Sequence, residues 1–168
     1  MTNDVLLNSA RFVALILAQV LIFDNIHLFG FINPYVYLLF LVLFPVRVNT
    51  MQFLFIGFLL GLTMDFFSDT GGIHAAACLV AAYLRPVFLR FSFGISIEYN
   101  SVKISNTPVG GRLTYITLVV LTHHLVLFFL EIFSLKHTLF IIKTVLFSSI
   151  FTILLSLVLM VIFSTKKR

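Results

Sequence analysis

Residues 57–86 read GFLLGLTMDFFSDTGGIHAAACLVAAYLRP, and they predict two membrane helices joined by a tight turn. Gly57, Gly61 and Asp65 recur every four residues, so they lie on one face of the first helix. A Gly-x-x-x-Gly spacing lets a second helix backbone approach closely, which is how helices associate inside lipid. The polar and glycine residues at 69–72 then provide the turn. The stretch therefore predicts a close helix seam that ends in acidic residues.

The rest of the chain is equally apolar: of 168 residues, 61% are hydrophobic and only 10% are charged. Soluble domains average about 45–50% apolar and about 25% charged residues. Because one transmembrane helix takes about 20 residues, six helices use roughly 120 positions and leave only short loops. The composition excludes functions that need a soluble catalytic, nucleotide-binding or DNA-binding domain, and it predicts a polytopic integral membrane protein.

We expect a single all-α transmembrane domain over residues 1–168, folded as a six-helix bundle. The second and third apolar runs are short, since at about 1.5 Å per residue they reach only about 24–26 Å of the ~30 Å hydrocarbon core. They are either short spanning helices or a re-entrant pair. The expected helices cover residues 9–29, 31–46, 51–67, 73–89, 114–133 and 138–163.

The positive charges are sorted along the chain. If the N-terminus is inside, nine of the 11 Lys and Arg residues fall on inner segments, and only Lys136 and Lys143 fall on the outer side. Cytoplasmic loops carry such an excess, so we expect a bacterial inner-membrane protein with both termini in the cytoplasm. The net charge of +5 then reflects topology and indicates no nucleic-acid partner. The inner residues are Arg11, Arg47, Arg85, Arg90, Lys103, Arg112, Lys166, Lys167 and Arg168.

The only sizeable loop is the expected cytoplasmic segment 90–112. Apolar and polar residues alternate over 91–98, a period of two that indicates a short strand or an interfacial segment. The segment is interpreted as a basic loop that touches anionic membrane lipids, or alternatively as a docking surface for a cytoplasmic partner.

Asp65 is the acidic residue that needs most explanation, because a charge inside hydrocarbon is costly. Near the end of a short helix it can cap the turn that follows, or pair with His74 or with an arginine. Asp65 and Asp69 share a face, but intramembrane aspartyl proteases usually take one Asp from each of two helices. The face is interpreted as internal helix packing with a polar clasp, or as a binding surface for another protein's transmembrane helix.

The remaining chemistry-bearing residues form no catalytic or metal-binding pattern. Cys78 is the single cysteine and lies in an apolar run, which gives neither a disulfide framework nor a thiolate site. The five histidines are scattered, without an i,i+4 pair, and no phosphate-binding glycine loop is present. We therefore assign no catalytic, cofactor-binding or metal-binding residue and expect a protein that is not an enzyme.

Residues 57–86 resemble the central signature of the MreD family of rod shape-determining proteins. In that family a glycine-containing helix ends in Asp and is followed by a glycine turn, a His, a small-residue helix and a Tyr-Arg exit. The segment 25–30, Asn33-Pro34 and Phe44-Pro45 resemble the version found in Bacteroidota. The residues that match the signature are Gly57, Gly61, Asp65, Gly72, His74, Tyr83 and Arg85; with Asp69 they are the candidates for partner binding or helix packing.

The resemblance implies a non-enzymatic scaffold subunit of the cell-elongation machinery, which supports side-wall peptidoglycan synthesis and cell shape. Its implied direct partner is an MreC-like bitopic membrane protein. Indirect partners are the MreB cytoskeleton, a RodA-type glycosyltransferase and its transpeptidase. The family is also similar in fold to the six-helix substrate-binding subunits of energy-coupling-factor transporters, so a vitamin-binding transporter subunit is the alternative function. That alternative requires a polar pocket near the outer face.

Overall fold

The structure is a computed structural model that describes residues 2–26, 30, 32–94, 103–132 and 138–163. All regular elements in these residues are helical, as expected. Five helices are long and apolar enough to cross a membrane. The elements are α1 (Thr2–Leu21), the 3₁₀ turn η1 (Phe23–Asn25), α2 (Leu38–Leu43), α3 (Thr50–Ser68), α4 (Ile73–Phe93), the 3₁₀ turn η3 (Ile104–Asn106), α5 (Val109–Ile132) and α6 (Thr138–Phe163).

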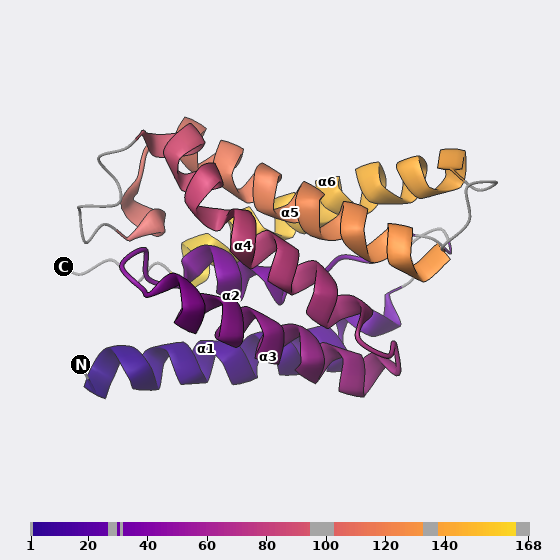
Figure 1. The fold of residues 1–168 in the computed structure, drawn as a ribbon, viewed down its shortest axis with the longest axis horizontal. Coiled ribbons are helices and arrows are strands. Elements are labelled where there is room, and N and C mark those ends of the chain that lie inside the picture. The colour runs from indigo at the N-terminus through magenta and orange to yellow at the C-terminus, as the bar shows by residue number, and fades with distance from the viewer. Residues whose placement is uncertain (1, 27–29, 31, 95–102, 133–137, 164–168) are drawn as a thin grey trace.

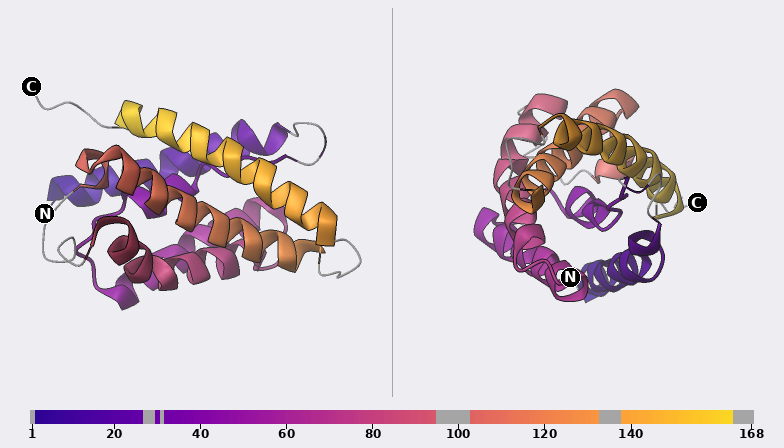
Figure 2. Two further views of the ribbon diagram at one scale, coloured as in Figure 1. Left: turned by 90° about the horizontal axis from the view of Figure 1, so that it is seen from above. Right: turned by 90° about the vertical axis from the view of Figure 1, so that its right-hand side faces the viewer.

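The five long helices surround the short helix α2, which lies in the middle of the ring when the molecule is viewed along its long axis (Figure 2). Helices α3, α4, α5 and α6 run alternately up and down, and each packs on the next in the chain. The start of α1 and the end of α6 lie at the same end of the molecule (Figure 1). This end also holds the loop between α2 and α3 and is called the arginine end below, because Arg47, Arg85 and Arg90 lie there.

The helix expected over 31–46, either a short span or half of a re-entrant pair, is much shorter than its expected bounds. The backbone is non-helical up to Val36, and the α-helix covers only six residues, Leu38–Leu43. Pro45 sets the C-terminal limit, because a proline disfavours helical geometry in the residue before it, and Phe44 is extended with a ψ of 142°. Pro34 disfavours helical geometry at Asn33 in the same way, and the N–H groups of Tyr35 and Val36 bond to side chains of α6 and α1. The α-helix fits between these two prolines. The segment is nevertheless the most deeply buried in the described chain, with residues 36–42 exposed by 4% or less.

The central position of α2 explains why all six of its residues are apolar although the helix is too short to span the hydrocarbon core. A short helix surrounded by protein on all sides needs apolar side chains on every face. The irregular backbone before this helix, in contrast, needs hydrogen-bond partners from neighbouring elements. The run expected at 51–67 is, in contrast, a regular helix of 19 residues, α3. The described residues thus form five long helices around one short central helix.

Other boundaries also differ from expectation. Helix α1 covers Thr2–Leu21 instead of residues 9–29, and α5 begins at Val109 instead of residue 114, inside the expected loop 90–112. Helix α4 continues to Phe93, so the residues 91–93 are helical and not part of a strand or a loop. The helix stops at Gly94, whose φ of +78° is a conformation that glycine adopts without strain. The remainder of the alternating pattern, at 95–102, lies outside the described residues.

Candidate functional site

A polar centre holds the non-helical segment 33–37 inside the ring of helices. Backbone N–H groups buried in a membrane protein must find partners, because no water is available there. Here side chains of α1 and α6 supply them. The bonds to backbone N–H run from Asn33 to the Ser148 hydroxyl (3.2 Å), from Tyr35 to Thr152 Oγ1 (3.0 Å) and from Val36 to Gln19 Oε1 (2.8 Å).

Gln19 is fully buried and joins three separate groups. Its Oε1 accepts from Val36, while its Nε2 donates to the carbonyl of Pro34 at 3.0 Å and to Asp24 Oδ1 at 2.7 Å. A single amide thus satisfies both a donor and an acceptor of the non-helical segment. Gln19 is the main polar link between α1 and the central segment.

Tyr37 links the centre to α4 and α5. Its hydroxyl lies 2.8 Å from His74 Nδ1 and 2.8 Å from His123 Nε2, and the side chain is fully buried. One hydroxyl can donate to one imidazole nitrogen and accept from the other, so the two bonds are compatible. The Tyr35 ring packs edge-on against His74 and His124 at centroid distances of 5.5 and 5.3 Å.

The hydrogen bonds of His124 define its tautomer. Nδ1 lies 2.8 Å from the carbonyl oxygen of Val120, which can only accept, so Nδ1 carries the proton. Nε2 is then an acceptor and lies 3.3 Å from Thr152 Oγ1. The Thr152 hydroxyl donates to His124 while its oxygen accepts from the N–H of Tyr35. A continuous chain of bonds therefore runs from α5 through α6 to the central segment.

Asp65 caps helix α4 from the end of α3. Its Oδ1 accepts from the N–H of His74 at 2.9 Å and its Oδ2 accepts from the N–H of Ala75 at 2.8 Å. Thr70 Oγ1 also donates to Oδ1. The N-cap position of α4 is Gly72, which has no side chain to accept these bonds, so a carboxylate nine residues before His74 takes that role. Of the alternatives open from sequence, the cap is confirmed.

Gly57 and Gly61 face α4 within the same chain. A Cβ at Gly61 would lie 2.5 Å from Ala75 Cα and 2.6 Å from Ala75 N, and it would also overlap the carbonyl oxygen of His74. A Cβ at Gly57 would lie 3.1 Å from Ala82 Cβ. The close approach at Gly61 brings α3 against the first turn of α4. Asp65 lies one turn after Gly61 on α3 and accepts hydrogen bonds from the N–H groups of the same turn of α4. This face is an internal seam, as the packing interpretation expects.

Arg85 is 4% exposed and holds the end of the central helix. Its guanidinium donates to the carbonyls of Phe44 and Pro45, and its Nε donates to the hydroxyl of Tyr115 at 3.1 Å. The guanidinium also lies 4.1 Å from the centre of the Phe53 ring, a cation–π distance. Carbonyls that α2 leaves unpaired at its C-terminus are thereby satisfied.

The other candidates lie outside this network or shape the turn. Asp69 is exposed at the end of α3 and has a φ of +52°, and Gly72 has a φ of +104°. Tyr83 is 68% exposed on α4. The structure therefore brings His74 and Arg85 into contact with the central segment and its C-terminal end, and it places Asp65 and Gly61 against the first turn of α4. Asp69 and Tyr83 lie apart from both.

Sequence reasoning missed the residues that bind the central segment. Gln19, Tyr37, His123, Ser148 and Thr152 lie on four different parts of the chain, and their partners are backbone groups or side chains distant in sequence. A glutamine in the middle of the first apolar run is the signal that could have indicated such a site. Among the described residues, no group of three His, Cys, Asp or Glu side chains is arranged to hold a metal ion.

The chain matches no protein-family model, no curated protein and no solved structure. The class defined by the fold is therefore a helical protein with five membrane-type helices around a buried, side-chain-supported central segment.

Removing the Tyr37 hydroxyl tests the polar centre. We expect Tyr37→Phe to lower stability by about 1–3 kcal/mol, because it leaves a nitrogen of His74 and one of His123 buried without this partner. Thermal unfolding in detergent measures the change. Tyr83→Phe is the matched control: that side chain is 68% exposed, so the change should stay within about 0.5 kcal/mol. Equal effects of the two variants would contradict the role given to Tyr37.

Proposed function

We propose that this protein is a non-enzymatic membrane scaffold of the MreD type, a subunit of the cell-elongation complex. It binds the transmembrane helix of an MreC-like bitopic protein and supports side-wall peptidoglycan synthesis and cell shape. Its indirect partners are the MreB cytoskeleton, a RodA-type glycosyltransferase and its transpeptidase. Two features support the proposal: the resemblance of residues 57–86 to the MreD signature, and an open small-residue surface on helix α1.

The surface is a small-residue face of α1, and it is the observation that carries the proposal. Ala10, Ala14 and Ala18 recur every four residues and so share one helix face; the first two are exposed and the third is half-buried. Small residues at this spacing let another helix approach closely in a membrane. The corresponding face of α3, at Gly57 and Gly61, is already covered by α4. The small-residue face of α1 is thus open to a partner.

Helix α1 also packs less on the rest of the chain than the other long helices do. In its most apolar 18 residues only 17% are buried, against 33% to 44% in the other four long helices. Its polar connection to the bundle comes from Gln19 near its C-terminal end. A partner helix on the N-terminal half of α1 adds packing where the chain itself supplies little.

The polar interior fits a scaffold role. The side chains of the polar centre described above bind backbone groups of the central segment or one another. They stabilise a fixed arrangement of helices, as a protein that presents helix surfaces to partners requires.

Co-purification with an MreC-like partner tests the proposal. We expect Ala14→Phe to reduce recovery of the partner strongly, by about tenfold or more, since one lost close helix contact of ~1.4 kcal/mol corresponds to a tenfold change. Val158→Phe places the same ring on the exposed face of α6 and should leave recovery unchanged. Rounded cells with Ala14→Phe and rod-shaped cells with Val158→Phe would agree with this.

Normal partner recovery with a stable, correctly inserted Ala14→Phe protein would overturn the assignment of α1. Gly61→Leu is a less selective test of partner binding. Gly61 lies against the backbone of α4, so this variant would lose the partner through misfolding.

We propose the bacterial inner membrane as the location, with both termini in the cytoplasm. Two observations support this orientation. The start of α1 and the end of α6 lie at one end of the molecule (Figure 1). Nine of the 11 Lys and Arg residues fall on the segments assigned to that side.

A vitamin-binding transporter subunit is the second candidate, and a pocket supports it. At the end opposite the arginine end, a pocket of about 290 Å³ is lined by polar side chains of several elements, including Asp24, Tyr35, His74 and Glu131. Such a pocket suits a small polar molecule. A vitamin that co-purifies at near-equal stoichiometry with the unchanged protein, and that is lost in Glu131→Gln, would favour this function over the scaffold.

A further inference from the structure

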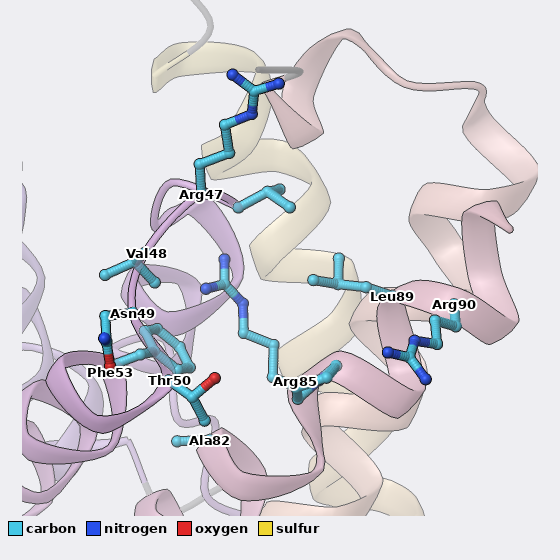
Figure 3. A pocket seen from close by; sticks show the side chains of 11 residues that line it. Arg47, Val48, Asn49, Thr50, Phe53, Ala82, Arg85, Leu89 and Arg90 are labelled. Carbon is cyan, nitrogen blue, oxygen red and sulfur yellow. The ribbon is translucent and has the colours of Figure 1, made fainter. Parts of the chain in front are cut away.

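A pocket of about 440 Å³ at the arginine end opens between the loop after α2 and the last turns of α4. It is lined by loop residues 46–50, by Phe53 of α3 and by residues of α4 between 82 and 90. Figure 3 shows Arg85 extending into this space, with Arg90 of α4 on one side and Arg47 of the loop on the other, its guanidinium directed away from Arg85. We propose that this pocket binds a phosphate group, carried by an anionic membrane lipid.

The charge of the pocket favours an anion. Three arginines line one pocket, and no carboxylate is among its described lining residues. Asp24, Asp65, Asp69 and Glu131, the four acidic residues with described side chains, belong to the segments at the opposite end of the molecule. An anion in the pocket is therefore attracted by three cations, with no described carboxylate nearby to oppose it.

The surroundings of Arg85 also favour an anion. Its side chain is 4% exposed, and its partners among the described residues are two carbonyls, one phenol hydroxyl and one aromatic ring, all of them uncharged. A buried charge is stabilised best by an opposite charge. Because a guanidinium has five N–H donors and three are engaged in these bonds, two remain for an anion.

The backbone around the pocket adds a partial positive charge. Helix α3 begins at Thr50, and the lining residues Val48, Asn49 and Thr50 include its N-terminus. The N-terminal end of a helix carries a partial positive charge and favours phosphate. Arginine is also the residue whose planar fork fits phosphate oxygens.

The location favours a lipid as the carrier of this phosphate. The pocket lies where α3 begins and α4 ends, which is the level of the headgroups for two membrane-spanning helices. On α4, Val87 and Phe91 are 60% and 74% exposed and offer an apolar surface for acyl chains next to the lining residues Pro86 and Arg90. Basic pockets at the cytoplasmic ends of transmembrane helices bind anionic headgroups in this way.

Lipid retention tests the proposal directly. The whole protein is placed in nanodiscs of mixed phosphatidylglycerol and phosphatidylcholine, released, and the retained lipid is counted by native mass spectrometry. We expect selective retention of phosphatidylglycerol by the unchanged protein. Arg47→Gln and Arg90→Gln should each reduce that retention by about tenfold, the effect of one lost charge-assisted hydrogen bond. Both side chains are exposed, so folding should persist; unfolding temperatures without lipid check this.

Lys103→Gln is the matched control, because Lys103 is an exposed cation of the same end that does not line this pocket. It should leave retention unchanged. Equal loss in Lys103→Gln, or equal retention of the two lipids by the unchanged protein, would overturn the proposal.

A second experiment adds inorganic phosphate to protein in detergent without lipid. If phosphate raises the unfolding temperature, and Arg47→Gln and Arg90→Gln abolish this rise, the pocket recognises phosphate. If phosphate raises the unfolding temperature as much as phosphatidylglycerol does, the ligand is free phosphate and not a lipid headgroup.

Discussion

Gly61→Ala is expected to destabilise the protein by about 1–3 kcal/mol or more, although it adds a single methyl group. The added Cβ would lie 2.5 Å from Ala75 Cα and 2.6 Å from Ala75 N. These are backbone atoms inside helix α4, which cannot rotate away as a side-chain terminus can. The helices α3 and α4 must separate, and this weakens the seam along its length. At about 2–4 °C per kcal/mol, the unfolding temperature in detergent should fall by several degrees.

Two other glycines provide graded controls for this prediction. Gly57→Ala places its Cβ 3.1 Å from the Ala82 Cβ, a contact that small shifts relieve, so its effect should be smaller. A Cβ at Gly110, in the first turn of α5, would have nothing within 4 Å, so Gly110→Ala should be neutral or slightly stabilising. A Gly61→Ala protein as stable as Gly110→Ala would show that the two helices are not in close contact.

Asp65→Ala is expected to cost about 2–4 kcal/mol, because it leaves the buried N–H groups of His74 and Ala75 without an acceptor, at about 1–3 kcal/mol each. The carboxylate also lies at the positive end of the α4 dipole. Both effects act on the turn that Gly61 contacts, so the loss is expected to spread to the bond between His74 and Tyr37. Thermal or denaturant unfolding in detergent measures it.

The variant Asp65→Asn distinguishes the loss of the helix cap from a general loss of negative charge. Asp65→Asn keeps one acceptor oxygen but turns an NH₂ group toward one of the two donors, so it should lose part of the stability. Asp69→Asn makes the same change four residues away at an exposed position, where Asn tolerates the φ of +52°. We expect it to be neutral. Equal losses in the two amide variants would contradict the capping role.

Local patterns predicted the long helices because an apolar run of about 20 residues has few other stable forms in a membrane. Gly61 and Asp65 were identified as one helix face from their spacing alone, and that face is the α3–α4 seam. The positions of the charges likewise assigned the arginines to one side, and Arg47, Arg85 and Arg90 do line one pocket.

The central segment was beyond such patterns. Its apolar residues 36–42 look like part of a spanning helix, and the length of the run indicated only that it was too short for an ordinary span. Its depth in the molecule is set by Gln19, Tyr37, Ser148 and Thr152, whose contacts join residues up to 117 positions apart. Hydropathy along the chain does not detect contacts between residues that are far apart in the sequence.

Residue type and spacing along the chain were enough to establish a helical protein built for a membrane, a glycine seam before Asp65 and cations gathered on one side. Each of these properties depends on a single helix or on the order of the segments. The packed structure was needed to show that Asp65 caps α4 and that Arg85 holds the end of α2, because both sets of bonds join backbone groups to side chains of another element. The same holds for the open face of α1, since its exposure depends on which helices lie beside it once the chain has packed.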